Sequence, residues 1–227
     1  MSATRKLNQD YVNNTLIPNY AAVAFRTEHG GNAATLSGFS YAGSNSSYSF
    51  GLFQYDVGAK GAEPAQNFLT SIGFNSTQLS QLSQHGGLDP AVQDALSAQL
   101  NLALQNPVNQ AALDQLNINR GQDLVSQVQN ALDKIDRANP SVALQIYASQ
   151  ELQLRLMDYA NQYNLDSTGA KAYMTHLLSG QSVLMPSGNT LALAPGQILT
   201  GAQLNSLVMN TQQGVANDEM FLTRSVA

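Results

Sequence analysis

The sequence predicts a mainly α-helical protein with one small β-hairpin. Helix-start signals recur along most of the chain, whereas a β-type pattern is confined to residues 38–58. There, the aromatic runs at 39–41 and 48–56 flank a cluster of Gly, Ser and Asn, which is typical of a hairpin. Because the chain has no linker, charge run or fixed-period repeat, we expect residues 1–227 to form a single domain.

Proline, glycine and capping residues predict the helix boundaries in chain order. The first helix is expected over residues 10–28, kinked or split by Pro18 and ended by the Gly-Gly pair at 30–31. Further helices are expected from Pro64 to Gly73, from Asp89-Pro90 to Leu104, from Pro107 to Asn117, from Gln122 to Arg137, and from Asn139-Pro140 to Asn164. The C-terminal part adds a short hairpin over 183–191 and a last helix opened by a Thr-x-x-Gln capping box at 200–203.

The composition favours a polar surface with few charges. Of 227 residues, 43% are hydrophobic and only 11% are charged, against a usual charged share of about 25%. The polarity comes from 21 asparagines and 23 glutamines, which suit hydrogen bonding to neutral sugars. The net charge of −5 argues against nucleic acid or an acidic membrane surface as a partner.

The same counts bear on cofactors and location. Cysteine is absent, so the sequence offers no disulfide, thiol nucleophile or Cys-bound metal. Three scattered histidines and no calcium-loop spacing lead us to expect neither a metal nor an organic cofactor. No secretory signal is expected in the first ten residues, and no run is long enough to span a bilayer. We therefore expect synthesis in the cytoplasm and delivery to the bacterial wall or periplasm by lysis, phage or a secretion system.

Glutamate is scarce, and one position stands apart. Of four glutamates, only Glu28 lies at the C-terminal end of an apolar helix and directly before a Gly-Gly pair. The negative end of the helix dipole, together with an apolar wall, would raise the pKa of this carboxyl and favour its protonated form. A protonated carboxyl can donate to a leaving-group oxygen. The alternative is a solvated glutamate at a helix terminus.

Glu28, the aromatic hairpin and the element Gly51-Leu-Phe-Gln54 together resemble the lysozyme-like superfamily. The resemblance is to the branch of goose-type lysozymes, soluble lytic transglycosylases, phage endolysins and related effectors. In that family a Glu ends the first helix of the catalytic core, and a strand with a Gly-hydrophobic-hydrophobic-Gln element lines the cleft beside it. The chain departs from the family in His29, where Ser is frequent, and in Phe53, where Met is usual. The resemblance is sharp only over residues 20–58.

The resemblance implies a peptidoglycan-cleaving glycosidase, a muramidase of lysozyme or lytic transglycosylase type. Glu28 would act as general acid on the bond between N-acetylmuramic acid and N-acetylglucosamine. The residues expected to bind substrate are Tyr48, Ser49, Phe50, Gln54, Tyr55 and Asn161. If the protein is an injected effector, the producing cell would need a cognate inhibitor protein as a partner.

A second carboxylate and two other functions stay open at this point. Asp56 lies two residues beyond Gln54 on the expected strand, so it could orient a water in a hydrolase, or simply end the hairpin if one glutamate suffices. A chitosanase-type hydrolase is a further alternative, because an acidic protein (pI about 4.9) suits a cationic polymer. The third is a non-catalytic protein whose amide-rich face binds glycans or a partner.

Overall fold

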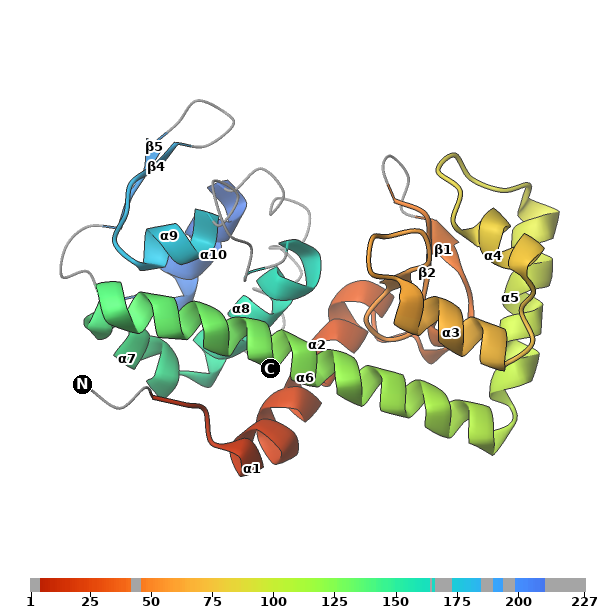
Figure 1. The fold of residues 1–227 in the computed structure, drawn as a ribbon, viewed down its shortest axis with the longest axis horizontal. Helices are drawn as coiled ribbons and strands as arrows, with labels where there is room; N and C mark the ends of the chain where they lie inside the picture. The colour runs from red at the N-terminus through yellow and green to blue at the C-terminus, as the bar shows by residue number, and fades with distance from the viewer. Residues whose placement is uncertain are drawn as a thin grey trace. The chain divides into compact units, whose positions relative to one another are not determined.

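The protein is mainly helical and carries a small antiparallel sheet, so the predicted fold class is confirmed at the level of helix and strand content (Figure 1). The computed structural model describes residues 5–41, 46–163, 165, 173–184, 190–193 and 199–210. The chain divides into two compact units, which are described separately below: the sheet unit, Ala24–Arg120, and the terminal unit, Met1–Val23 with Gly121–Ala227. The single domain expected over residues 1–227 stays a prediction.

Pro18 lies just after a widened turn in the first helical run. The run consists of α1 (Gln9–Tyr11), the π-helical turn η1 (Val12–Leu16) and α2 (Ile17–His29). Proline has no N–H to give to the preceding turn. The turn before it is widened, and the N–H of Ile17 donates to the carbonyl of Val12. The expected kink or split at Pro18 therefore takes the form of a π turn.

The sheet unit contains three short strands with the order β1-β2-β3. They are β1 (Ser40–Tyr41), β2 (Tyr48–Phe50) and β3 (Tyr55–Asp56). Both pairings are antiparallel, with Ser40 opposite Ser49 and Phe50 opposite Tyr55. The sequence predicts a single hairpin here. The structure has two, because residues 51–54 form a turn rather than a continuing strand.

Helices that precede and follow the strands in the sequence pack with them to form a hydrophobic core. They are η2 (Ala33–Ser37), α3 (Glu63–Ser71), α4 (Ser76–Leu82) and α5 (Pro90–Leu104). The Asp89 carboxylate accepts from the N–H of Ala91 at 2.8 Å, as predicted for the start of α5. Phe50 is fully buried between aromatic rings, 5.7 Å from Phe39 and 5.9 Å from Phe68 between ring centroids. The strands are thus fixed by packing more than by their short ladders.

Helix α6 (Pro107–Ala138) is one continuous helix, whereas the sequence predicts two helices separated near residue 121. The prediction is wrong because Gly121 acts here as a packing residue and not as a helix breaker. A Cβ at this position would lie 2.7 Å from Cγ2 of Ile17. The absence of a side chain allows the two helices to approach closely.

The opposite error occurs after Pro140, where the sequence predicts one long helix. The structure has two, α7 (Pro140–Ala148) and α8 (Gln150–Tyr163). Ser149 between them is extended, with φ −123° and ψ 109°, and its hydroxyl accepts from the N–H of Leu152 at 3.3 Å. The buried Gln153 amide donates to the carbonyls of residues 146 and 147 at 2.9 and 3.1 Å. These bonds satisfy both helix ends.

The C-terminal strands and the last helix follow the prediction, and one further helix precedes them. The predicted elements are the paired strands β4 (Val183–Leu184) and β5 (Thr190–Leu191), and α10 (Gly201–Asn210). The helix that the sequence analysis did not predict is α9 (Tyr173–Leu178). The turn expected at residues 187–189 lies outside the described residues. The capping box is confirmed, because Thr200 Oγ1 accepts from the N–H of Gln203 at 3.2 Å and Gln203 Oε1 accepts from the N–H of Thr200 at 2.8 Å. Among the described helices, none combines the length and apolar character of a membrane span.

The close approach at Gly121 gives a test of this packing. We expect Gly121→Ala to lower the free energy of unfolding by about 1–3 kcal/mol, because Ile17 has to move away from the new methyl group. Ser126→Ala on the exposed side of the same helix is the control and should change stability little. Chemical denaturation measures both. Equal stability of the two variants would show that α6 tolerates a side chain at this contact.

Candidate active site

The carboxyl group of Glu28 lies in the last turn of α2 and is half-buried. Among the described residues, it has no hydrogen-bond or ion-pair partner. Burial raises the pKa of this carboxyl above its ordinary value, which is the direction that the sequence predicts. A raised pKa without a partnering cation keeps part of the group protonated at mildly acidic pH.

The glycines after Glu28 determine where the helix ends. Gly30 and Gly31 have φ angles of 58° and 75°, in the left-handed region that favours glycine. The N–H of Gly31 reaches back to the carbonyl of Phe25 at 3.2 Å, which is the closure of a Schellman-type end. The helix therefore stops one residue beyond Glu28, at His29.

The buried imidazole of His29 joins the end of α2 to the turn between β2 and β3. Its Nε2 lies 3.1 Å from the carbonyl oxygen of Gly51 and 3.2 Å from that of Leu52. Its Nδ1 lies 2.8 Å from the hydroxyl of Thr35. The side chain is only 5% exposed, so it holds this junction from inside.

These neighbours define the proton on His29. Two carbonyl oxygens can only accept, so Nε2 must carry a proton and donate to them. Burial lowers the pKa of His29, which favours the neutral ring at neutral pH. In the neutral ring Nδ1 has no proton, and the single hydroxyl hydrogen of Thr35 is shared between Nδ1 and the carbonyl oxygen of Asn32, which lie 2.8 and 2.7 Å from Oγ1. His29 thus has a defined structural role beside Glu28.

Gln54 closes the turn that His29 holds. Its backbone adopts φ 51°, which is unusual for a residue with a side chain, and its N–H donates to the carbonyl of Gly51 at 3.1 Å. Its side-chain oxygen accepts from the Ser40 hydroxyl at 2.7 Å. The sequence predicts Gln54 within a strand, on the same face as Asp56. The structure corrects this, because Gln54 belongs to the turn and β3 begins after it.

Asp56 is occupied by hydrogen bonds within the hairpin. Its carboxylate accepts from the hydroxyl of Ser47, from the N–H of Ser47 at 3.3 Å and from the N–H of Gly58 at 3.0 Å. Ser47 is completely buried, and a Cβ at Gly58 would lie 2.8 Å from the Ser47 hydroxyl. These contacts give Asp56 a structural role at the end of the sheet. Its predicted part in catalysis stays a prediction.

Three residues expected to contact sugar belong to the core instead. Tyr48, Ser49 and Phe50 are 1%, 7% and 0% exposed. The hydroxyl of Tyr48 accepts from the N–H of Leu88 at 2.6 Å, so it faces the protein interior. Both faces of β2, the central strand, are covered, and these side chains therefore offer no surface to a substrate in this conformation.

Two further predicted substrate contacts, Tyr55 and Asn161, are not core residues of β2. Tyr55 is half-buried, and its hydroxyl donates to Asn117 Oδ1 at 3.1 Å. Burial raises the pKa of Tyr55, so the phenol stays protonated and can donate. Asn161 lies on α8, in the terminal unit, and its part in a site with Glu28 stays a prediction.

A cavity of about 400 Å³ opens beside the turn, within the sheet unit. Leu52 of the turn and Leu36, Leu104 and Leu113 give it an apolar lining. The polar lining is mostly uncharged and comes from Ser37, Asn101, Gln105, Gln110, Asp114 and Asn117. The sequence reasoning missed this cavity, because its amides lie on two helices, α5 and α6, with no motif to connect them.

Comparisons of the chain with models of protein families, with characterised proteins and with solved structures found no match. The site therefore has to be interpreted from the chemistry of its own residues.

The contacts of Asp56 predict a stability defect. Asp56→Ala removes the acceptor of the Ser47 hydroxyl and N–H, whereas the N–H of Gly58 keeps the Ser47 hydroxyl oxygen as an acceptor at 2.6 Å. We therefore expect a loss of about 1–3 kcal/mol in unfolding free energy. Asp94→Ala on an exposed position of α5 is the matched control and should have little effect. Thermal and chemical denaturation measure both variants. An Asp56→Asn protein of parental stability that loses glycan cleavage by orders of magnitude would contradict the structural role.

Proposed function

We propose that this protein cleaves the glycan strand of peptidoglycan, with Glu28 as its general acid. The observation that carries the proposal is the state of Glu28: a half-buried carboxyl, unpartnered among the described residues, whose pKa burial raises. Protonating a glycosidic oxygen requires a carboxyl that stays protonated above its ordinary pKa.

The cavity of the sheet unit supports a neutral polymer as the substrate, although Glu28 itself is not among its lining residues. The cavity beside the turn is lined by leucines and amides, with Asp114 as its charged residue. Amides pair with hydroxyl and acetamido groups, and an apolar floor suits the faces of sugar rings and N-acetyl methyl groups. The amide-rich, weakly charged composition agrees with such a ligand.

A mechanism with one carboxylate fits the contacts better than one with two. Asp56 already accepts three hydrogen bonds from Ser47 and Gly58, whereas the Glu28 carboxyl has no partner among the described residues. In the proposed reaction, Glu28 gives its proton to the glycosidic oxygen and the bond to the anomeric carbon breaks. The 6-hydroxyl of the same muramic acid residue attacks that carbon and returns its proton to Glu28. The product carries a 1,6-anhydro end and no water is consumed, as in a lytic transglycosylase.

Replacing the proton donor tests the proposal. Glu28→Gln keeps the shape of the side chain but cannot donate the proton, so we expect cleavage of purified sacculi to fall by about 10²–10⁴-fold. Glu63→Gln, an exposed glutamate at the start of α3, is the control and should cleave at the parental rate. Mass spectrometry of the released muropeptides gives rate and product, and anhydro ends are expected. Reducing ends would show a hydrolase, and cleavage by Glu28→Gln within a few-fold of the parent would end the assignment.

The same variant has a predicted effect on folding that serves as its internal check. A raised pKa means that the folded state disfavours the ionised carboxylate. The associated stability is present below the unfolded pKa of about 4.3 and is lost as pH rises through the folded pKa. Glu28→Gln should therefore melt above the parent at pH 7 and together with it at pH 3. This outcome would show that Glu28→Gln loses activity because the proton donor is missing and not because the protein unfolds.

The activity of the parent protein should depend on pH through the same group. Because Glu28 must be protonated, the rate should fall as pH rises through its pKa, and burial places this falling limb above the ordinary value of about 4.3. The measurement is the initial rate of sacculus solubilisation across the pH range at constant ionic strength. A rate that continues to climb up to pH 9 would assign the proton transfer to another group.

A further inference from the structure

A second cavity, of about 620 Å³, lies within the terminal unit. It is lined by the N-terminal segment before α1, by α1 and η1, and by residues around the junction of α7 and α8. Its volume is in the range of sites for small organic molecules, roughly 300–1,000 Å³. Glu28 and the turn that it adjoins belong to the sheet unit, so this cavity is separate from the proposed catalytic function.

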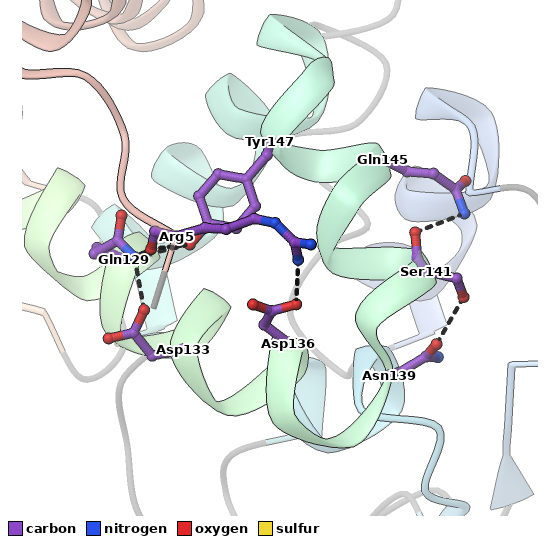
Figure 2. A network of polar contacts seen from close by, with 8 residues as sticks. All are labelled: Arg5, Gln129, Asp133, Asp136, Asn139, Ser141, Gln145 and Tyr147. Carbon is purple, nitrogen blue, oxygen red and sulfur yellow. Dashed lines mark hydrogen bonds and ion pairs between the residues drawn. The ribbon is translucent and has the colours of Figure 1, made fainter. Parts of the chain in front are cut away.

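Hydrogen bonds hold the wall of this cavity in place. The Tyr147 hydroxyl and the Gln129 amide both donate to the carbonyl oxygen of Arg5, at 2.7 and 3.0 Å, which are ordinary hydrogen-bond distances. Gln129 also accepts from the N–H of Leu7 at 3.0 Å. Figure 2 shows this network, with the Arg5 guanidinium directed to Asp136 at 2.7 Å. The N-terminal segment is therefore anchored to α6 and α7, and the cavity is a built feature.

One donor that lines the cavity lacks an acceptor. The side-chain nitrogen of Gln150 is buried and has no acceptor within hydrogen-bond geometry among the described residues. The Gln150 side chain lies near the Tyr11 hydroxyl and opposes the rise in the pKa of Tyr11 that burial causes. The Tyr11 hydroxyl itself donates to Gln153 at 2.8 Å. An unpaired buried amide of this kind costs stability unless a ligand supplies the acceptor.

The charged residues that line the cavity are cations, while the carboxylates of Asp133 and Asp136 lie close enough to act on Tyr147 at its wall. Arg5 and Lys6 line it, and none of the described lining residues carries a carboxylate. Arg5 pairs with Asp136 through one nitrogen, and its guanidinium has further N–H donors. Lys6 has no ion-pair partner among the described residues. In a protein of net charge −5, the Lys6 ammonium and the unpaired Gln150 donor are the groups at this cavity that favour a negative, acceptor-rich ligand.

We propose that this cavity binds a small organic anion, whose carboxylate or phosphate oxygens accept hydrogen bonds from the Gln150 amide and the Lys6 ammonium. The rings of Tyr11 and Tyr147 line the same cavity and give contact surface to the carbon part of the ligand. The site does not depend on Glu28, and its failure would leave the proposed glycan cleavage untouched.

Two probes and a neutral control test the site. Citrate presents carboxylates, inorganic phosphate presents a phosphate, and erythritol is an uncharged polyol. Each is titrated into the full-length protein at constant ionic strength and followed by amide chemical shifts in NMR spectra. We expect saturable shifts for citrate or phosphate around residues 5–11 and 147–153, and none for erythritol. The stronger of the two anions identifies the group that the site prefers.

Two variants separate the site from general charge effects. Lys6→Gln should weaken anion binding by about fivefold or more, whereas Lys60→Gln, an exposed lysine of the sheet unit, should not change it. Gln150→Leu should also weaken binding, while it raises the melting temperature of the free protein because the unpaired buried donor is gone. No saturable binding of either anion at tens of millimolar, or equal loss in Lys6→Gln and Lys60→Gln, would overturn the proposal.

Discussion

The contact between the His29 imidazole and two backbone carbonyls is the interaction on which the candidate site depends. Nε2 lies within 3.2 Å of the carbonyl oxygens of Gly51 and Leu52, and the ring is buried. It therefore fixes the last residue of α2 against the turn that joins β2 and β3. Because Glu28 precedes His29 directly, this contact also determines where the carboxyl emerges. Without it, the carboxyl would sit at an unsupported helix end.

The two carboxylates have different environments. Asp56 accepts from Ser47 and Gly58 and is part of the hairpin structure. The Glu28 carboxyl is half-buried and has no partner among the described residues, and burial raises its pKa. Similar groups with different surroundings perform different tasks, which is how acid and structural roles are commonly divided. The proposed assignment of Glu28 as the acid depends on this difference in environment and not on the number of acidic residues.

Local rules were sufficient for much of the fold. The start of α5 at Asp89, the glycine-terminated end of α2 and the capping box at Thr200 follow from side chains that act on their own neighbourhood. Contacts between distant segments were not visible in the sequence. Gly121 stays within the helix and packs against Ile17, which is more than a hundred residues away in the sequence. The end of α7 at Ala148 has a nearer cause, because the amide of Gln153 donates to the carbonyls of residues 146 and 147.

The site was predictable to a similar extent. Glu28 could be singled out by its place before two glycines, and the direction of its pKa shift followed from that setting. The predicted sugar contacts failed at β2, because a pattern of alternating faces assumes that one face is open. Here both faces are covered, and Tyr48 and Phe50 are core residues. The left-handed backbone of Gln54 and the role of His29 depend on contacts that no local pattern encodes.

The central claim concerns one proton, and an NMR titration of the Glu28 side-chain carboxyl measures it directly. The carboxyl carbon can be assigned by comparing the parent with Glu28→Gln and followed from acidic to neutral pH. The account predicts a midpoint clearly above the ordinary glutamate value of about 4.3. A midpoint at or below that value would mean that Glu28 is ionised like a solvated glutamate and would contradict its role as a general acid.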